Sequence, residues 1–256
     1  MTTVSAERLA RIFVEVADTL IDEFDVLDFL NMLVTRTADL VEGSTVGLLL
    51  TDHRDELRFM AASDESTRLL ELFQVQNQEG PCMDAYRTAE PVANSDLRRG
   101  ASRWPLFAPR ATAAGFRSVH AFPLRLRREV IGAMNVFGVA PGITFDDADI
   151  ESMQALTNVA AISLLQEPRG AVRTEQLQGA LDSRITVEQA KATIALAHGI
   201  SPDQAFVLLR AYARSGNHHL VEVAATVVAD LTQLPSLARP RRNRPPASAR
   251  VDRAEP

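Results

Sequence analysis

The chain of 256 residues is poor in cysteine, in aromatic residues and in lysine. Its only cysteine, Cys82, excludes an internal disulfide bond and a metal site built from several cysteines. No apolar run approaches the roughly 18 residues that a membrane span needs. The first residues include a carboxylate, Glu7, where a signal peptide has a basic start followed by an apolar stretch. We therefore expect a protein of a reducing, bacterial-type cytoplasm that has no membrane partner.

The common signatures of enzymes and metal sites are also missing. The five histidines include no pair that has metal-ligand spacing together with acidic or cysteine support. The sequence has no Ser–His–Asp order, no glycine-rich phosphate loop and no pair of carboxylates with catalytic spacing. We therefore expect neither catalysis nor a bound metal, and the sequence indicates no particular cofactor.

The sequence has an ordinary globular composition, with 46% hydrophobic and 23% charged residues, and an uneven distribution of charge. Residues 1–172 hold 16 arginines against 25 acidic residues, which is a net charge of −9. Residues 173–256 hold 11 basic residues against 8 acidic ones, which is a net charge of +3. An acidic first part and a basic second part indicate two modules with different partners, of which the second suits a polyanion.

The first module has the pattern of an α+β domain, because its apolar residues recur at helical spacing in some segments and alternate in others. Helices are expected over residues 9–20, 27–41, 65–76 and 146–164. Strands are expected over residues 45–51, 57–61, 91–93, 117–124 and 129–137. Since tight turns join consecutive strands, we expect a mainly antiparallel sheet of five or six strands, with the terminal helices together on one face.

The second module is helical. Pro168-Arg169-Gly170 breaks the preceding helix and predicts a hinge. Gly199 ends the next helix, and Ser201 with Gln204 forms a capping box that starts another. A third amphipathic helix, over residues 220–231, completes a bundle of three. The predicted organisation is a first domain over 1–167, a hinge over 168–170, a helical domain over 171–232 and a disordered, basic tail rich in proline and arginine over 233–256.

Part of the helical module resembles a known RNA-binding domain. The strings that carry the likeness lie within residues 183–228 and include Val187-Glu188-Gln189-Ala190-Lys191, His198-Gly199-Ile200-Ser201, Ala205-Phe206, Leu209-Arg210 and Val223-Ala224. They resemble the ANTAR domain, a three-helix RNA-binding module of bacterial transcription antiterminators. Ala192 stands where that family commonly has glycine. Because alanine is the better helix former, this departure leaves the assignment intact.

The first module resembles a GAF sensory domain of the kind that precedes ANTAR. The strings that carry this likeness lie within residues 7–166 and are Glu79-Gly80-Pro81-Cys82-Met83-Asp84-Ala85, Arg103-Trp104-Pro105, Gly115-Phe116-Arg117-Ser118, Ala121-Phe122-Pro123-Leu124 and Ile131-Gly132-Ala133-Met134-Asn135. The resemblance implies a sensor for a small molecule or a partner protein, neither of which the sequence identifies. One class of GAF-fold enzyme reduces methionine sulfoxide with several cysteines, and the single cysteine of this chain excludes that chemistry.

The GAF resemblance suggests a few ligand contacts. Cys82 follows Gly80 and Pro81 at the expected start of a helix, where the helix dipole would favour a thiolate and hence a redox sensor. A buried, inert thiol is the alternative that we favour. The ring of Trp104 either lines a pocket or fills the core. The candidate ligand-binding residues are Glu79, Cys82, Trp104 and His120.

The ANTAR resemblance implies contacts to RNA. Arg184 and Lys191 share one side of the first helix of the second module, and Arg210 and Arg214 lie one turn apart on the next. Without the resemblance these residues would be read as solvated faces with surface salt bridges. The candidate RNA-binding residues are Arg184, Lys191, Arg210, Arg214 and His218. We expect a structural role for the other motif residues: the small side chains of Ala190, Ala205, Ala213 and Ala224 let three helices approach closely, and Phe206 packs with them.

Together the resemblances imply a signal-responsive antitermination regulator that binds RNA hairpins in nascent transcripts, whose unstacked loop bases are open to readout. The series Leu177, Leu181 and Ile185 predicts a seam for a homodimer. Tight docking of the basic face on the acidic domain would be a simple off state. The alternative is a small-molecule-binding GAF regulator that acts on DNA or through a protein partner. The largely apolar run over residues 205–209 is unlike a helix that reads DNA bases.

Overall fold

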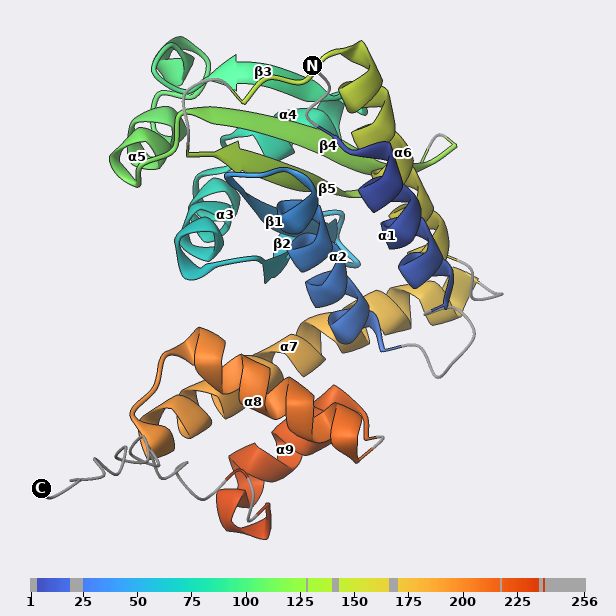
Figure 1. The fold of residues 1–256 in the computed structure, drawn as a ribbon, viewed down its shortest axis with the longest axis vertical. Helices are drawn as coiled ribbons and strands as arrows, with labels where there is room; N and C mark the ends of the chain where they lie inside the picture. Colours follow the sequence, from blue (N-terminus) through green and yellow to red (C-terminus); the bar gives the residue numbers. More distant parts are fainter. Residues whose placement is uncertain are drawn as a thin grey trace, which may run out of the picture.

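The computed structural model describes residues 4–18, 25–127, 129–139, 143–165, 170–216, 218–234 and 237, without the side chains of residues 170–178 and 180–182. Figure 1 shows a sheet with helices on both faces in the first part of the chain, and three helices packed together in the second. The two parts are in contact where the first long helix of the second part runs beside the sheet.

The first part is built on a five-stranded sheet with the order β2-β1-β5-β4-β3. Within the described residues its strands are β1 (Ser44–Thr51), β2 (Leu57–Ala62), β3 (Val92–Asp96), β4 (Ser118–Leu126) and β5 (Glu129–Gly138). All neighbouring strands are antiparallel, and Met134 on central strand β5 lies between Leu48 of β1 and Phe122 of β4. This confirms the predicted antiparallel α+β architecture.

Helices cover both faces of this sheet. One face carries α1 (Ala6–Asp18), α2 (Val26–Leu40) and α6 (Asp147–Leu165), and the other carries α3 (Glu65–Asn77), α4 (Pro81–Thr88) and α5 (Phe107–Ala113), with a short 3-10 turn η1 (Gly100–Ser102) before α5. The carboxylate of Asp25 starts α2, because it accepts hydrogen bonds from the backbone N–H groups of Leu27 and Asp28. As expected, the first and last helices lie on the same face.

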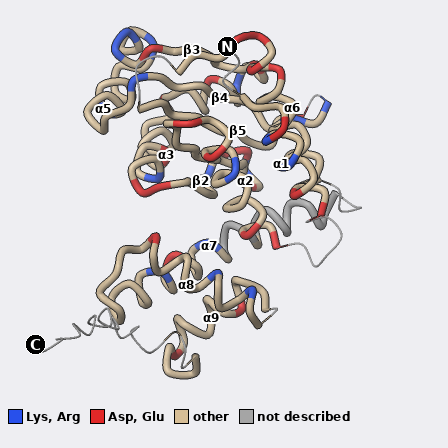
Figure 2. The backbone as a smooth tube through the Cα atoms, viewed as in Figure 1, with Lys and Arg blue, Asp and Glu red and all other residues tan. Residues whose placement is uncertain are grey.

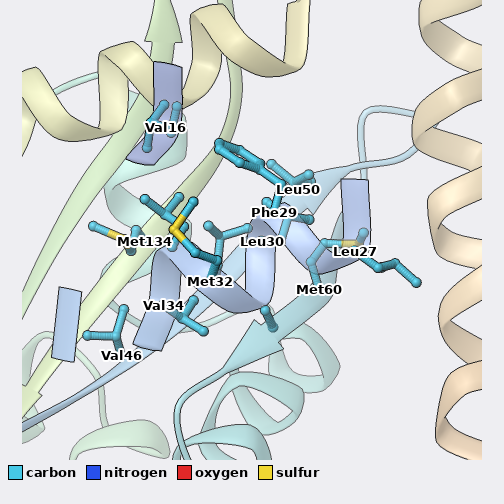
Figure 3. Packing of buried hydrophobic residues seen from close by; sticks show 14 of the residues in the cluster. Val16, Leu27, Phe29, Leu30, Met32, Val34, Val46, Leu50, Met60 and Met134 are labelled. Atoms are coloured by element: carbon cyan, nitrogen blue, oxygen red, sulfur yellow. The ribbon is translucent and has the colours of Figure 1, made fainter. Parts of the chain in front are cut away.

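The sheet divides the core into two buried layers. Along β4, Phe122 and Leu124 belong to the layer under α1, α2 and α6, whereas Val119 and Ala121 belong to the layer under α3, α4 and α5. Figure 3 shows the first of these layers, in which Leu30 of α2 lies beside Met134 of the sheet. The two faces of the sheet are therefore separate environments.

The second part is a bundle of α7 (Gly170–His198), α8 (Pro202–Ser215) and α9 (Leu220–Asp230), followed by the 3-10 turn η2 (Leu231–Gln233). Gly199 adopts a positive φ of 64° after α7, which glycine tolerates without a steric cost. The predicted capping box is confirmed, since Ser201 Oγ accepts from Gln204 N and Gln204 Oε1 accepts from Ser201 N.

The expected domain limits stay predictions. Pro168 and Arg169 lie outside the described residues, and Gly170, the last residue of the expected hinge, is the first residue of α7. Most of the expected tail also lies outside them. Leu237, which falls within that tail, is buried and its carbonyl contacts the His198 ring, so the packed part of the bundle extends past residue 232. Within the described ranges, no helix combines the length and the apolarity that crossing a bilayer requires.

Candidate nucleic-acid interface and sensory core

The two candidate cations of α7 are both partly enclosed. The Arg184 guanidinium lies 3.9 Å from the centroid of the Phe59 ring and donates to the Phe59 carbonyl on β2, an edge strand of the sheet. Burial lowers the pKa of Arg184 to about 10, so the side chain remains charged at neutral pH. Lys191 is only 9% exposed, with its Nζ 2.9 Å from Glu188 Oε1 and 5.5 Å from the centroid of the Phe206 ring.

The two candidate arginines of α8 share one carboxylate on the first domain. Arg210 Nε lies 2.6 Å from Oδ1 of Asp28, and Arg214 Nη2 lies 3.3 Å from Oδ2 of the same residue. Asp28 is in the first turn of α2, and its side chain is 30% exposed. The sequence gives no indication of this contact, because partners 182 residues apart have no local signature.

These four cations lie along one surface that faces the first domain. A narrow crevice there is lined by residues of α2, β2, α3, α7 and α8, among them Asn31, Arg68, Arg184, Lys191 and Phe206. Its volume of about 40 Å³ is far below the several hundred Å³ of a pocket for an organic ligand, so the two parts are closely packed. Figure 2 shows basic positions on both α7 and α8.

The remaining candidates of the second part divide into exposed and buried positions. His218, the fifth candidate RNA contact, is exposed in the short connection before α9. The motif alanines lie in the bundle core, where each is almost fully buried: Ala190, Ala205, Ala213 and Ala224. Phe206 is only half-buried, because its ring faces the crevice between the two parts.

Three of the four candidate ligand contacts lie on the α3–α4–α5 side of the sheet, each engaged within the fold. Glu79 Oε1 accepts from the backbone N–H groups of Leu106 (2.7 Å) and Phe107 (2.8 Å) at the start of α5. Trp104 is buried, and its Nε1–H donates to Asp84 at 3.0 Å. Cys82 is fully buried, and burial raises the pKa of its thiol, which supports the alternative of an inert thiol.

His120 lies on the opposite side of the sheet. Its ring stacks at 4.2 Å on Phe145, and its Nδ1 accepts from the backbone N–H of Asn94. Burial lowers the pKa of His120 to about 4, so the imidazole is neutral at physiological pH. The structure therefore does not bring His120 together with Cys82 and Trp104, because residues of a strand alternate between the two faces of its sheet.

A buried polar cluster that sequence reasoning missed lies between α3 and the sheet. Glu71 of α3 accepts from Asn135 Nδ2 of β5 at 2.8 Å and from Gln74 Nε2 at 2.9 Å. Gln74 in turn accepts from the backbone N–H of Cys82 at 3.2 Å. The cluster lies directly over Gly47 of β1, where a Cβ atom would overlap the Glu71 side chain.

Burial raises the pKa of Glu71 to about 8. The hydrogen bonds from Asn135 and Gln74 lower this pKa but offset only part of the effect of burial. The carboxyl group is thus mostly protonated at neutral pH. A signal for this was present in the sequence. Thr67, Leu70, Glu71 and Gln74 follow one another at intervals of three, one and three residues, the spacing of a single helix face. All four therefore lie on the buried face of α3.

A large hollow on the first domain lies away from the candidate ligand contacts. A hollow of about 940 Å³ on the outer side of the first domain is lined by residues of α1 and α6 such as Arg8, Phe13 and Ser152. None of the four candidate ligand contacts lines it. In the part of the chain that the structure describes, no three His, Cys, Asp or Glu side chains are grouped as metal ligands would be.

Two family profiles match the sequence. The GAF domain profile matches residues 25–164, and the ANTAR domain profile matches residues 175–228. Both are regulatory domains. Among curated proteins, none matches the chain.

Several solved structures have a similar fold. Free methionine-R-sulfoxide reductase from Neisseria meningitidis, in complex with its substrate, is 17% identical with a TM-score of 0.48, and the match covers 70% of this chain and 97% of that one. The GAF domain from Acinetobacter phosphoenolpyruvate-protein phosphotransferase is 18% identical with a TM-score of 0.46, covering 63% of this chain and 98% of that one. A domain of a putative two-component sensor histidine kinase from Sinorhizobium meliloti is 14% identical with a TM-score of 0.48, covering 59% and 98%.

Proposed function

Since the chain belongs to the GAF domain family and carries an ANTAR domain after it, we propose that it is a signal-responsive transcription antitermination regulator without catalytic activity. The ANTAR domain binds structured RNA hairpins in nascent transcripts and so prevents a terminator from forming. The GAF domain acts as the sensor, for a small molecule or a partner protein. A regulator of nascent bacterial transcripts acts in the cytoplasm.

The observation that carries this proposal is the clustering of cations within the ANTAR match. Arg184, Lys191, Arg210 and Arg214 come from two helices and lie along a single surface of the bundle. Long cationic side chains on one surface are what a folded RNA requires, because its phosphates are closely spaced and its loop bases accept hydrogen bonds. The alanines that hold the bundle together are distinct residues, so the binding surface is separable from the core.

A homodimer fits the proposal, since two paired hairpins suit two ANTAR domains. Ile185, on the expected seam of α7, is 62% exposed. The side chains of Leu177 and Leu181 lie outside the described residues. An exposed apolar residue on a long helix is typical of a surface that pairs with another helix.

The test is a binding assay with a pool of two-hairpin RNAs that have randomised loops, in which duplex DNA is the competitor. Lys191→Ala and Arg210→Ala should each weaken RNA binding by about 5- to 150-fold, since a charge-assisted contact contributes ~1–3 kcal/mol. If the contact is to phosphate, the slope of log affinity against log salt should become shallower by about one unit. Alanine is a good helix former, so helicity should be unchanged.

Arg11→Ala is the matched control, because Arg11 is an exposed helical arginine of the first domain that pairs with Glu7. It removes the same charge and should leave RNA binding unchanged. Wild-type affinity in both motif variants, or equal binding of duplex DNA, would contradict the proposal. The second result would favour a regulator that acts on DNA.

A further inference from the structure

The surface that we assign to RNA is covered in this structure by the GAF domain. Arg210 and Arg214 hold the carboxylate of Asp28, and Arg184 lies on Phe59. Lys191 is enclosed in the crevice between the two domains. Four of the five candidate RNA contacts thus face α2 and β2, which belong to the sensor.

We propose that this arrangement is a closed, RNA-free state in which the α2–β2 face of the GAF domain occupies the RNA-binding surface of the ANTAR domain. This inference rests on the proposed function and adds its regulation. Binding of RNA and docking of the two domains are mutually exclusive, because the same guanidinium groups serve both.

The chemistry of the contact is that of a phosphate substitute. The two oxygens of Asp28 each accept from a different arginine of α8, as two oxygens of a phosphate group would. Residues 1–172 carry a net charge of −9, whereas residues 173–232 of the bundle hold 5 basic and 6 acidic residues, so the charge complementarity is local to the side chains at this contact. The Asp28 carboxylate is therefore an intramolecular competitor for a phosphate group at Arg210 and Arg214.

The apolar part of the interface fixes the position of this contact. Leu27 of α2, Met60 of β2 and Val187 of α7 are all buried and line the same crevice. Leu27 lies one residue before Asp28 in α2. Packing of Leu27 in the crevice therefore keeps the Asp28 carboxylate within reach of Arg210 and Arg214. The docking is specific because the apolar contact and the ion pairs of Asp28 must form in the same arrangement of the two domains.

The contact is also weak enough to be released. Asp28 and Arg210 keep 30% and 21% of their side-chain surface exposed, and Arg214 keeps 63%. Partly exposed ion pairs contribute little free energy, so a signal that moves α2 by a small amount, or an RNA of sufficient affinity, can open the interface. α2 is well placed to transmit such a movement, because Leu30 and Val34 on the same helix are packed in the sheet core (Figure 3).

The test is to remove the competitor rather than the RNA contacts. Asp28→Asn in the full chain should bind the same two-hairpin RNA pool about two- to fivefold more tightly than the wild type. The gain follows because apparent affinity is reduced by the fraction of molecules that are closed. In RNA-free protein, the Arg210 Nε–H should exchange faster with water in this variant, as measured by NMR.

Asp39→Asn is the matched control. Asp39 is on the same helix and pairs with Arg36 within that helix, so its substitution removes the same charge without touching the interface. It should change neither RNA affinity nor the exchange of the Arg210 Nε–H. Unchanged affinity in Asp28→Asn together with weakened binding in Arg210→Ala would overturn the inference and leave the proposed function standing. If no variant binds hairpin RNA, the proposed function fails first and the inference falls with it.

Discussion

The two domains hold their candidate functional residues in different ways. In the GAF domain, Glu79, Cys82, Trp104 and His120 are tied into the fold by capping, burial or stacking. In the ANTAR domain, Arg210 and Arg214 reach across to a carboxylate of the other domain and remain partly exposed. The GAF candidates therefore cannot be substituted without disturbing the fold, whereas the two ANTAR arginines can exchange their carboxylate partner for another anion.

The difference follows from solvation. Removing a buried side chain from an apolar layer lowers the free energy of unfolding by several kcal/mol, because burial of apolar surface is lost and a cavity is left. An ion pair that retains contact with water contributes at most about 1 kcal/mol, because water screens it and competes for both partners. Substitutions at buried positions should therefore cost much more stability than substitutions at the exposed ion pairs.

The largest effect is expected at Trp104. Trp104→Ala should lower the free energy of unfolding by about 3–5 kcal/mol, because it leaves a cavity beside Phe107 and removes the hydrogen bond to Asp84. Trp104→Phe is the control, since it keeps an aromatic ring and loses only part of the volume. Denaturant unfolding checks both. A cost below 1 kcal/mol for Trp104→Ala would show that the ring is not part of the core.

The next effect concerns the alanine core of the bundle. Ala224 is fully buried in α9, so Ala224→Leu should force the helices apart and cost about 1–3 kcal/mol. Ala225→Leu places the same side chain on the exposed face one residue later and should cost little. Thermal unfolding followed by circular dichroism separates them. Equal melting temperatures would argue against close helix packing at this position.

The pH dependence of stability should report Glu71. Between pH 6.5 and 8 the folded chain keeps a proton on Glu71, whose pKa is about 8, while the unfolded chain has lost it, since the ordinary pKa is 4.5. The unfolded state binds fewer protons, so stability falls as pH rises, by up to about 1.4 kcal/mol per pH unit. Between pH 4.5 and 6.5 this effect is offset by His120, whose pKa of about 4 means that only the unfolded imidazole is charged.

Glu71→Gln should remove the slope between pH 6.5 and 8. Glu65→Gln on the same helix is the control, because Arg68 lowers the pKa of Glu65 and keeps it ionised throughout this range. Denaturant midpoints at a series of pH values measure the slope. The same slope in the wild type and in Glu71→Gln would assign it to another group.

The smallest effect is expected at Arg214. Arg214→Ala should change the free energy of unfolding by less than about 1 kcal/mol, because the side chain is 63% exposed and its contact with Asp28 is 3.3 Å long. Denaturant unfolding of the full chain measures it. A loss above 2 kcal/mol would mean that the ion pairs hold the domains together structurally, and the contrast between the two sets would disappear.

Local patterns in the sequence predict most of the elements and their order, but not helix α5 (Phe107–Ala113). Periodicity predicted the antiparallel sheet with its β4–β5 hairpin and the three helices of the bundle. The capping box of Ser201 and Gln204, and the helix end at Gly199, were readable because these signals involve neighbours within a few residues. The two family resemblances were carried by local strings in the same way.

Which side chains share an environment depends on how the elements pack in three dimensions. Nothing local indicates that Asp28 lies against Arg210, that His120 faces away from Cys82, or that Glu71 lies over Gly47. These relations depend on how strands pair and helices pack over separations of tens to nearly two hundred residues. Because burial sets the pKa of Glu71 and docking sets the partner of Arg210, the chemistry of these residues is a property of the fold rather than of their positions in the sequence.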